Sequence, residues 1–155
     1  MEANRILPDL QSALICEDVR QERGGNFILI GILSSLRVPK VPISALKLFF
    51  FSRWTAGFGV FKESIHLVAP DQTTVVRKSQ IKFTLRDPSQ NWTNVTMFTQ
   101  VTFKLEGVYY VEIMVDDVMK LRFPLPVTIS KPKDSDPAEP PDGPESENEQ
   151  PGSKE

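Results

Sequence analysis

Apolar and polar side chains alternate along most of this chain, and this pattern constrains its fold more than any other feature. Between Val118 and Ser130, every odd-numbered residue from 119 to 129 is apolar, and the even-numbered residues from 120 onward are charged, hydroxylated or proline. Successive side chains of a β-strand point to opposite faces, so this segment is predicted to be a strand with one buried face. Pro124 and Pro126 lack an N–H group, which predicts a position at a sheet edge or a bulge.

Seven further segments are predicted to be strands for the same reason. They are residues 12–17, 26–33, 45–54, 61–68, 73–86, 92–103 and 109–115. Clusters of Gly, Pro, Asp and Asn separate several of them, and no segment combines a helical period with helix caps. Many short strands without intervening helices favour an all-β fold. We expect an antiparallel β-sandwich of about eight strands, immunoglobulin-like in architecture.

A short pattern near the end of the strand region supports the sandwich. Leu105, Gly107 and Tyr109 have the spacing of a tyrosine corner, in which the tyrosine hydroxyl bonds to nearby backbone and fixes a crossing between sheets. We therefore assign these residues a structural role rather than a chemical one.

Composition divides the chain at about residue 130. Residues 131–155 contain no large apolar side chain and six prolines, and their three lysines and eight acids give a charge of −5. The whole chain has a charge of −2, so residues 1–130 carry about +3. We predict an N-terminal extension over residues 1–10, a β-sandwich domain over 11–130 and a disordered, acidic, proline-rich tail over 131–155. The start of the chain lacks the apolar run of a secretory signal, so a cytoplasmic location is expected.

Several segments together resemble a known family. The opening Ala13–Arg20 reads ALICEDVR and is followed by Gly24-Gly25 and by Leu29–Gly31; the proline-bearing segment Val38–Pro42, the aromatic strand 49–54 and Gly107 with Tyr109 come later. This set resembles a family of small uncharacterised bacterial all-β proteins, classed as a domain of unknown function. The resemblance covers about residues 10–130. It implies an all-β bacterial cytoplasmic protein and supplies no activity, cofactor or site residue.

Catalytic and metal-binding signatures are not visible in the sequence. Cys16 and His66 are the only residues of their types, which is too few for the usual zinc ligand set. A Cys–His dyad would require two distant strands to pair. Carboxylates near Glu17–Glu22, Asp87 and Asp116 are interpreted as turn residues rather than as a calcium site. We therefore expect no enzyme activity, no cofactor and no metal.

The strand over residues 45–54 carries apolar residues on both faces. Leu46, Leu48, Phe50 and Trp54 form the better core face, and the opposite face carries Lys47, Phe49, Phe51 and Arg53. Because two charges make full burial of that second face costly, we predict a semi-exposed aromatic pair with a charged rim that serves as a partner surface. The alternative is that residues 34–44 or the N-terminal residues cover it.

These observations favour a non-catalytic binding or assembly module whose partner is another protein or a second copy of the chain. The first alternative is a single-stranded nucleic-acid binder that uses the basic face of Lys78, Lys82 and Arg86, with Trp92 or Phe49 as a stacking platform. The small positive charge of the domain argues against nucleic acid, and no membrane partner is expected. An enzyme of an unrecognised type is the second alternative.

Overall fold

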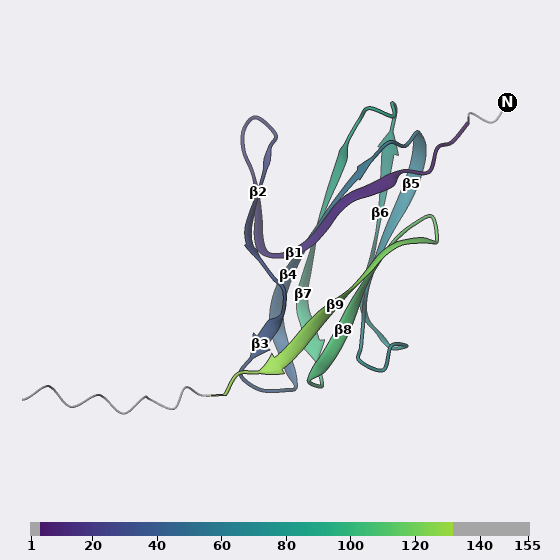
Figure 1. Ribbon diagram of the computed structural model, residues 1–155. Helices are drawn as coiled ribbons and strands as arrows, with labels where there is room; N and C mark the ends of the chain where they lie inside the picture. Colours follow the sequence, from purple (N-terminus) through teal and green to yellow (C-terminus); the bar gives the residue numbers. More distant parts are fainter. Residues whose placement is uncertain (1–3, 132–155) are drawn as a thin grey trace, which may run out of the picture.

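The computed structural model describes residues 4–131, which form two β-sheets packed face to face (Figure 1). The first sheet has the strand order β2-β1-β4-β7 and the second the order β3-β9-β8-β5-β6. The strands are β1 (Asp9–Gln21), β2 (Phe27–Ile32), β3 (Leu36–Val38), β4 (Ile43–Thr55), β5 (Gly59–Val68), β6 (Val75–Leu85), β7 (Trp92–Phe103), β8 (Gly107–Val115) and β9 (Val118–Ile129). This arrangement confirms the all-β sandwich. Within residues 4–131 there is no helix that could cross a membrane.

The core between the sheets is built from the apolar residues that alternate along the strands. Its largest fully buried side chains include Trp54, Phe50, Phe61, Phe103 and Tyr109. Aromatic contacts join the sheets: Trp54 of β4 stacks on Phe83 of β6, with ring centroids 5.7 Å apart. The other predicted inward residues of β4, β5, β6 and β8 therefore occupy the core; Leu46 is partly buried against it, and Ile81 is only partly buried.

The strand pairing differs from the prediction at one place. Eight strands were expected to pair only antiparallel, but Leu36–Val38 forms a ninth strand that pairs parallel with Val127–Ile129 of β9. This strand is three residues long and lies in a proline-bearing segment, so it has too few residues to show a period of two. Because β3 reaches only the end of β9, Pro124 and Pro126 lie at a sheet edge, as predicted.

The domain begins earlier than the boundary expected after residue 10. Ile6 and Phe58 exchange two backbone hydrogen bonds of 2.9 Å, and Pro8 is buried. Arg5 donates to the Val60 carbonyl at 2.9 Å and pairs with the Asp116 carboxylate. These contacts join residues 5–10 to both sheets. The predicted tail lies outside the described residues, apart from Lys131.

The tyrosine corner has the expected geometry. The Tyr109 hydroxyl donates a hydrogen bond of 2.9 Å to the Leu105 carbonyl, and the ring is 2 % exposed. Gly107 has a φ of 144°, and a Cβ at this position would lie 2.9 Å from Pro70. Only glycine suits both constraints, so the spacing of glycine and tyrosine follows from the crossing between β7 and β8.

We predict that Tyr109→Phe lowers the free energy of unfolding by about 1 kcal/mol, the net value of one hydrogen bond. The substitution keeps the buried ring and removes only the hydroxyl that bonds Leu105. Denaturant unfolding of both proteins measures the difference. Unchanged stability would mean that the hydroxyl does not hold the corner.

Candidate functional site

The hairpin formed by β1 and β2 extends beyond the body of the first sheet (Figure 1). β4 pairs with β1 only as far as Cys16, and the rest of β1 pairs with β2 alone, from Asp18 opposite Ile30 to Gln21 opposite Phe27. The turn is closed by a hydrogen bond of 2.8 Å from the Glu22 amide to the Asn26 carbonyl. The side chains of β2 therefore point to two opposite faces of the hairpin.

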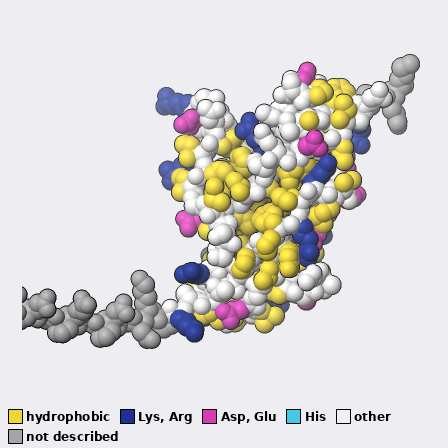
Figure 2. Space-filling view, in the orientation of Figure 1, with side chains coloured by type: hydrophobic (Ala, Val, Ile, Leu, Met, Phe, Trp, Pro, Cys, Tyr) yellow, Lys and Arg dark blue, Asp and Glu magenta, His cyan; other side chains and the backbone are white. Residues whose placement is uncertain are grey.

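One face of β2 carries three exposed isoleucines. Ile28, Ile30 and Ile32 are 43 %, 38 % and 58 % exposed. β2 is an edge strand and contains no charged residue and no proline. Figure 2 shows hydrophobic side chains over the hairpin and across the middle of the same side of the molecule. Sheet edges are usually protected by charges, prolines or bulges, so an apolar edge of this kind is typical of a pairing surface.

Gly31 limits the length of this edge. Its φ is 65°, and the Glu17 side chain lies 2.6 Å from the place that a Cβ would occupy. A residue with this φ interrupts the extended conformation, so the straight part of the edge runs from Phe27 to Ile30 and Ile32 follows the bend.

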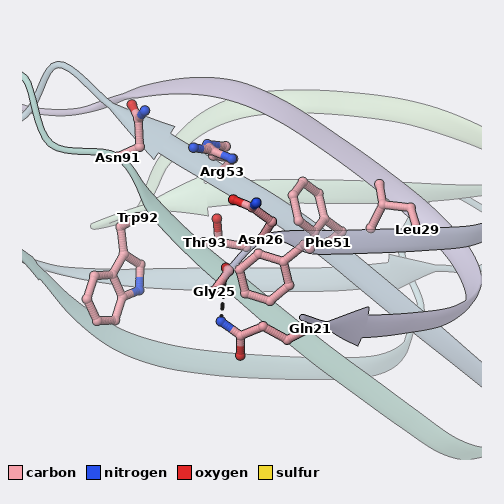
Figure 3. Close-up of a pocket in the computed structure, with 10 residues that line it drawn as sticks. Gln21, Gly25, Asn26, Leu29, Phe51, Arg53, Asn91, Trp92 and Thr93 are labelled. Carbon is pink, nitrogen blue, oxygen red and sulfur yellow. Dashed lines mark hydrogen bonds between the residues drawn. The ribbon is translucent and has the colours of Figure 1, made fainter. Parts of the chain in front are cut away.

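The other face of the hairpin covers an open groove of about 590 Å³ over the outer surface of β4 and β7 (Figure 3). Phe27 contacts Phe51 edge to face, with ring centroids 5.9 Å apart. The groove is lined by Gln21, Gly25, Asn26, Phe27, Leu29, Phe51, Arg53, Asn91, Trp92 and Thr93. Phe27 and Leu29 of β2 point into the groove. The isoleucines alternate with them and therefore lie on the opposite face of the strand.

Arg53 lies in this groove without a charged partner. Its Nε is buried and has no hydrogen-bond partner, and no acid among residues 4–131 forms an ion pair with it. None of the residues that line the groove is acidic. Trp92 is among the lining residues and is 39 % exposed, and its indole N–H donates to the Asn94 side chain at 2.8 Å. The groove therefore combines one uncompensated positive charge with aromatic walls.

The hairpin covers only half of the predicted partner surface, which consists of Lys47, Phe49, Phe51 and Arg53. Lys47 is exposed, with its ammonium 5.2 Å from the centre of the half-buried Phe49 ring. Phe51, however, is only 7 % exposed because Phe27 covers it. The expectation that both rings are semi-exposed is therefore wrong for Phe51, and the cover is β2 rather than residues 34–44 or the N-terminal residues. Phe51 and Arg53 meet in the groove, whereas Lys47 and Phe49 do not line it.

A buried carboxyl group in the core was missed in the sequence. Glu63 is 1 % exposed, and its Oε2 accepts hydrogen bonds of 2.5 Å from Ser52 and from the Trp54 indole. Burial raises the pKa of this carboxyl, and the hydrogen bonds, which lower it, do not fully compensate. The sequence pattern could have predicted its burial, because Glu63 stands between Phe61 and Ile65 at alternate positions on the inward face of β5. Enclosed in this way, it links the two sheets and contacts no ligand from solvent.

The residues considered for catalysis and metal binding are not brought together. Cys16 lies in β1 and His66 in β5, which belong to different sheets. Burial also raises the pKa of the Cys16 thiol, which disfavours the reactive thiolate. In the part of the chain that the structure describes, no three His, Cys, Asp or Glu side chains are close enough to hold a metal ion.

Comparison with known proteins identifies the family. A model described as a family of unknown function, DUF6941, matches residues 11–128. The chain belongs to the DUF6941 family. The matched region of this DUF6941 protein contains all of β2 and every residue that lines the groove. No curated protein matches the chain.

Proposed function

We propose that this DUF6941 protein is a non-catalytic binding module that docks a protein partner on the free edge of β2. The observation that supports this function is the run of exposed isoleucines at alternate positions of an edge strand without charge or proline. An extended segment of the partner adds a strand to the sheet beside Phe27–Ile30. The backbone hydrogen bonds of such a strand give affinity, and the alternate side chains give specificity.

The other edges of the two sheets are each protected. The β6 edge carries Arg77, Lys78 and Lys82, which oppose strand addition by their charge and hydration. Arg77 also donates to the Thr99 carbonyl and so occupies the edge of β7, which is further bent at Gln100, where φ is 53°. β3 has only three residues. The edge of β2 is thus the surface on which strand addition meets the least resistance.

The isoleucine face gives this docking its apolar contribution. A fully buried isoleucine side chain contributes about 1.5–3 kcal/mol relative to an exposed one. Ile28, Ile30 and Ile32 are each between one third and two thirds exposed, so each retains part of that contribution for a complex. The partner segment is therefore expected to carry β-branched or aromatic residues at every second position.

Ile30→Lys tests this function, because a lysine in the middle of the edge opposes strand addition. Ile30 is exposed, so the substitution should change the free energy of unfolding by less than about 0.5 kcal/mol. Val75→Lys is the matched control, since Val75 is 43 % exposed and lies on the charged edge of β6. Tagged wild-type and variant proteins are compared by quantitative capture from the native host, followed by hydrogen exchange on the recovered complex.

The expected result is that Ile30→Lys loses the partner that the wild type and Val75→Lys retain. The partner should also slow hydrogen exchange in β2. Equal recovery by all three proteins, or protection confined to another strand, would contradict docking on β2.

Single-stranded nucleic-acid binding is the second candidate, and one observation favours it. Lys82 and Arg86 share a shallow hollow of about 460 Å³ with Trp92, which places two cations beside an exposed ring. Phe49 lies outside this hollow. Salt separates the two functions, because phosphate contacts weaken steeply as salt rises whereas an apolar strand interface does not. Titration of a fluorescent oligonucleotide at increasing salt concentration measures this dependence.

A further inference from the structure

We infer that the groove beneath the hairpin is a binding site for a carboxylate attached to an apolar or aromatic body, with the Arg53 guanidinium as its partner. This inference goes beyond the proposed docking function, because the groove lies on the side of β2 opposite the isoleucines. It names a ligand class for a surface whose charge is not balanced within the described residues.

Arg53 supplies the charge that the ligand must balance. A guanidinium that is partly buried loses hydration, and this loss is recovered only through hydrogen bonds or an opposite charge. The Arg53 Nε is buried without a hydrogen-bond partner, and the ten lining residues include no carboxylate. A carboxylate bound in the groove would provide the opposite charge and would accept hydrogen bonds from the terminal nitrogens of the guanidinium, since the buried Nε is closed to a ligand. The planar guanidinium also suits a carboxylate, which it can bind with two parallel hydrogen bonds.

The walls of the groove define the rest of the ligand. Phe51 and Trp92 lie on different sides of Arg53, while Asn26, Asn91 and Thr93 supply neutral polar groups around it (Figure 3). The Phe27 ring packs edge to face on Phe51 and extends the aromatic wall. A volume of about 590 Å³ lies within the usual range of small-molecule sites. An apolar or aromatic body bound against these rings brings an attached carboxylate to the guanidinium.

The charge of the groove favours a carboxylate over a phosphate. Arg53 is the only charged residue among those that line it. A single guanidinium balances a monoanion, whereas a phosphate group carries up to two negative charges and is usually held by several donors or cations. The carboxylate can belong to a free organic acid or to an acidic side chain in a peptide, and these two sources share the same chemistry at Arg53.

The full chain is titrated with two matched pairs of probes. Phenylpropionate and its neutral amide represent the free acid, and a blocked tetrapeptide with Asp beside Phe, compared with its Asn analogue, represents the peptide source. Trp92 is the useful fluorescence reporter, since the only other tryptophan, Trp54, is fully buried. Backbone amide chemical shifts of residues in the groove confirm the location of binding.

Arg53→Gln removes the charge, Arg53→Lys keeps the charge without the planar fork, and Arg37→Gln is a matched control at the exposed position of β3. In the wild type, the acid of at least one pair should bind about tenfold more tightly than its neutral analogue. Arg53→Gln should abolish that preference, Arg53→Lys should reduce it and Arg37→Gln should preserve it. Whichever pair shows the preference identifies the source of the carboxylate.

Three results would overturn the inference. They are equal binding of acid and neutral analogue in both pairs, unchanged preference in Arg53→Gln, and no saturation by either acid at millimolar concentration. Thermal melting checks that Arg53→Gln folds, and its melting temperature should not fall, because the substitution removes an unpaired charge. If Arg53→Gln does not fold, the difference in affinity between each acid and its neutral analogue on the wild type still tests the inference. Ile30→Lys should bind the probes normally, so failure of this site and failure of docking on β2 are distinguishable.

Discussion

Phe51→Ser lowers the free energy of unfolding by about 3–5 kcal/mol, the usual cost of removing a buried phenylalanine. Phe51 is on the outer face of its sheet, yet it is only 7 % exposed because the Phe27 ring lies over it. The substitution removes the contact that holds the hairpin against β4 and leaves a cavity beneath β2. Denaturant unfolding measures the loss of stability, and faster hydrogen exchange in β2 reports the release of the hairpin.

Phe49→Ser is the matched control on the same face of the same strand. Phe49 is half-buried, so its removal should cost on the order of 1–2 kcal/mol. Exchange in β2 should stay close to that of the wild type, since Phe49 does not line the groove. Equal losses of stability from the two substitutions would show that β2 does not shield Phe51 in solution.

The stability of the wild type should fall as pH rises above 4.5 because of Glu63. In the unfolded chain this carboxyl has its ordinary pKa of 4.5, and burial in the fold raises that pKa. Between the two values the folded state holds a proton that the unfolded state has released. The stabilisation is therefore fully present below pH 4.5 and is lost as pH rises through the folded pKa.

Glu63→Gln should remove this part of the pH dependence. The glutamine oxygen can still accept hydrogen bonds from Ser52 and Trp54, but the side chain has no charge to desolvate. The difference in unfolding free energy between the two proteins, measured from about pH 4 to about pH 8, isolates Glu63 from other groups. Asp71, whose pKa hydrogen bonds from Thr74 lower to about 2, contributes in the acid range below this window. A difference that does not change with pH would mean that Glu63 is not buried in solution.

The sequence predicted the sandwich well because its main determinant is local. Inward residues such as Phe83 and Leu85 alternate with exposed lysines and arginines along one strand, and this alternation does not depend on which strand lies beside it. The parallel pairing of Leu36–Val38 with β9 does depend on a distant neighbour, and no period within three residues could reveal it. The tyrosine corner was predictable because glycine and tyrosine meet their constraints within five residues.

The candidate site was only partly predictable for the same reason. Strand parity placed Phe51 and Arg53 on the outer face of the sheet, but parity does not say what covers that face. The cover is Phe27, which reaches Phe51 through the path of the hairpin and not through any feature of residues near 51. Glu63, in contrast, could have been assigned to the core from its position between Phe61 and Ile65.

The parallel contact between β3 and β9 also sets an order of assembly during synthesis. Among the strands that the structure describes, β9 is the last to be made, yet it lies between β8 and β3. Ser130, directly after β9, donates to the Val38 carbonyl, 92 residues earlier in the chain. A growing chain can close the β1–β2 hairpin locally, but Leu36 and Val38 remain without their neighbour until β9 is made. Such non-local pairing slows folding and prolongs the exposure of apolar strands. The nascent protein thus exposes the uncharged edge of β2 before β9 completes the core.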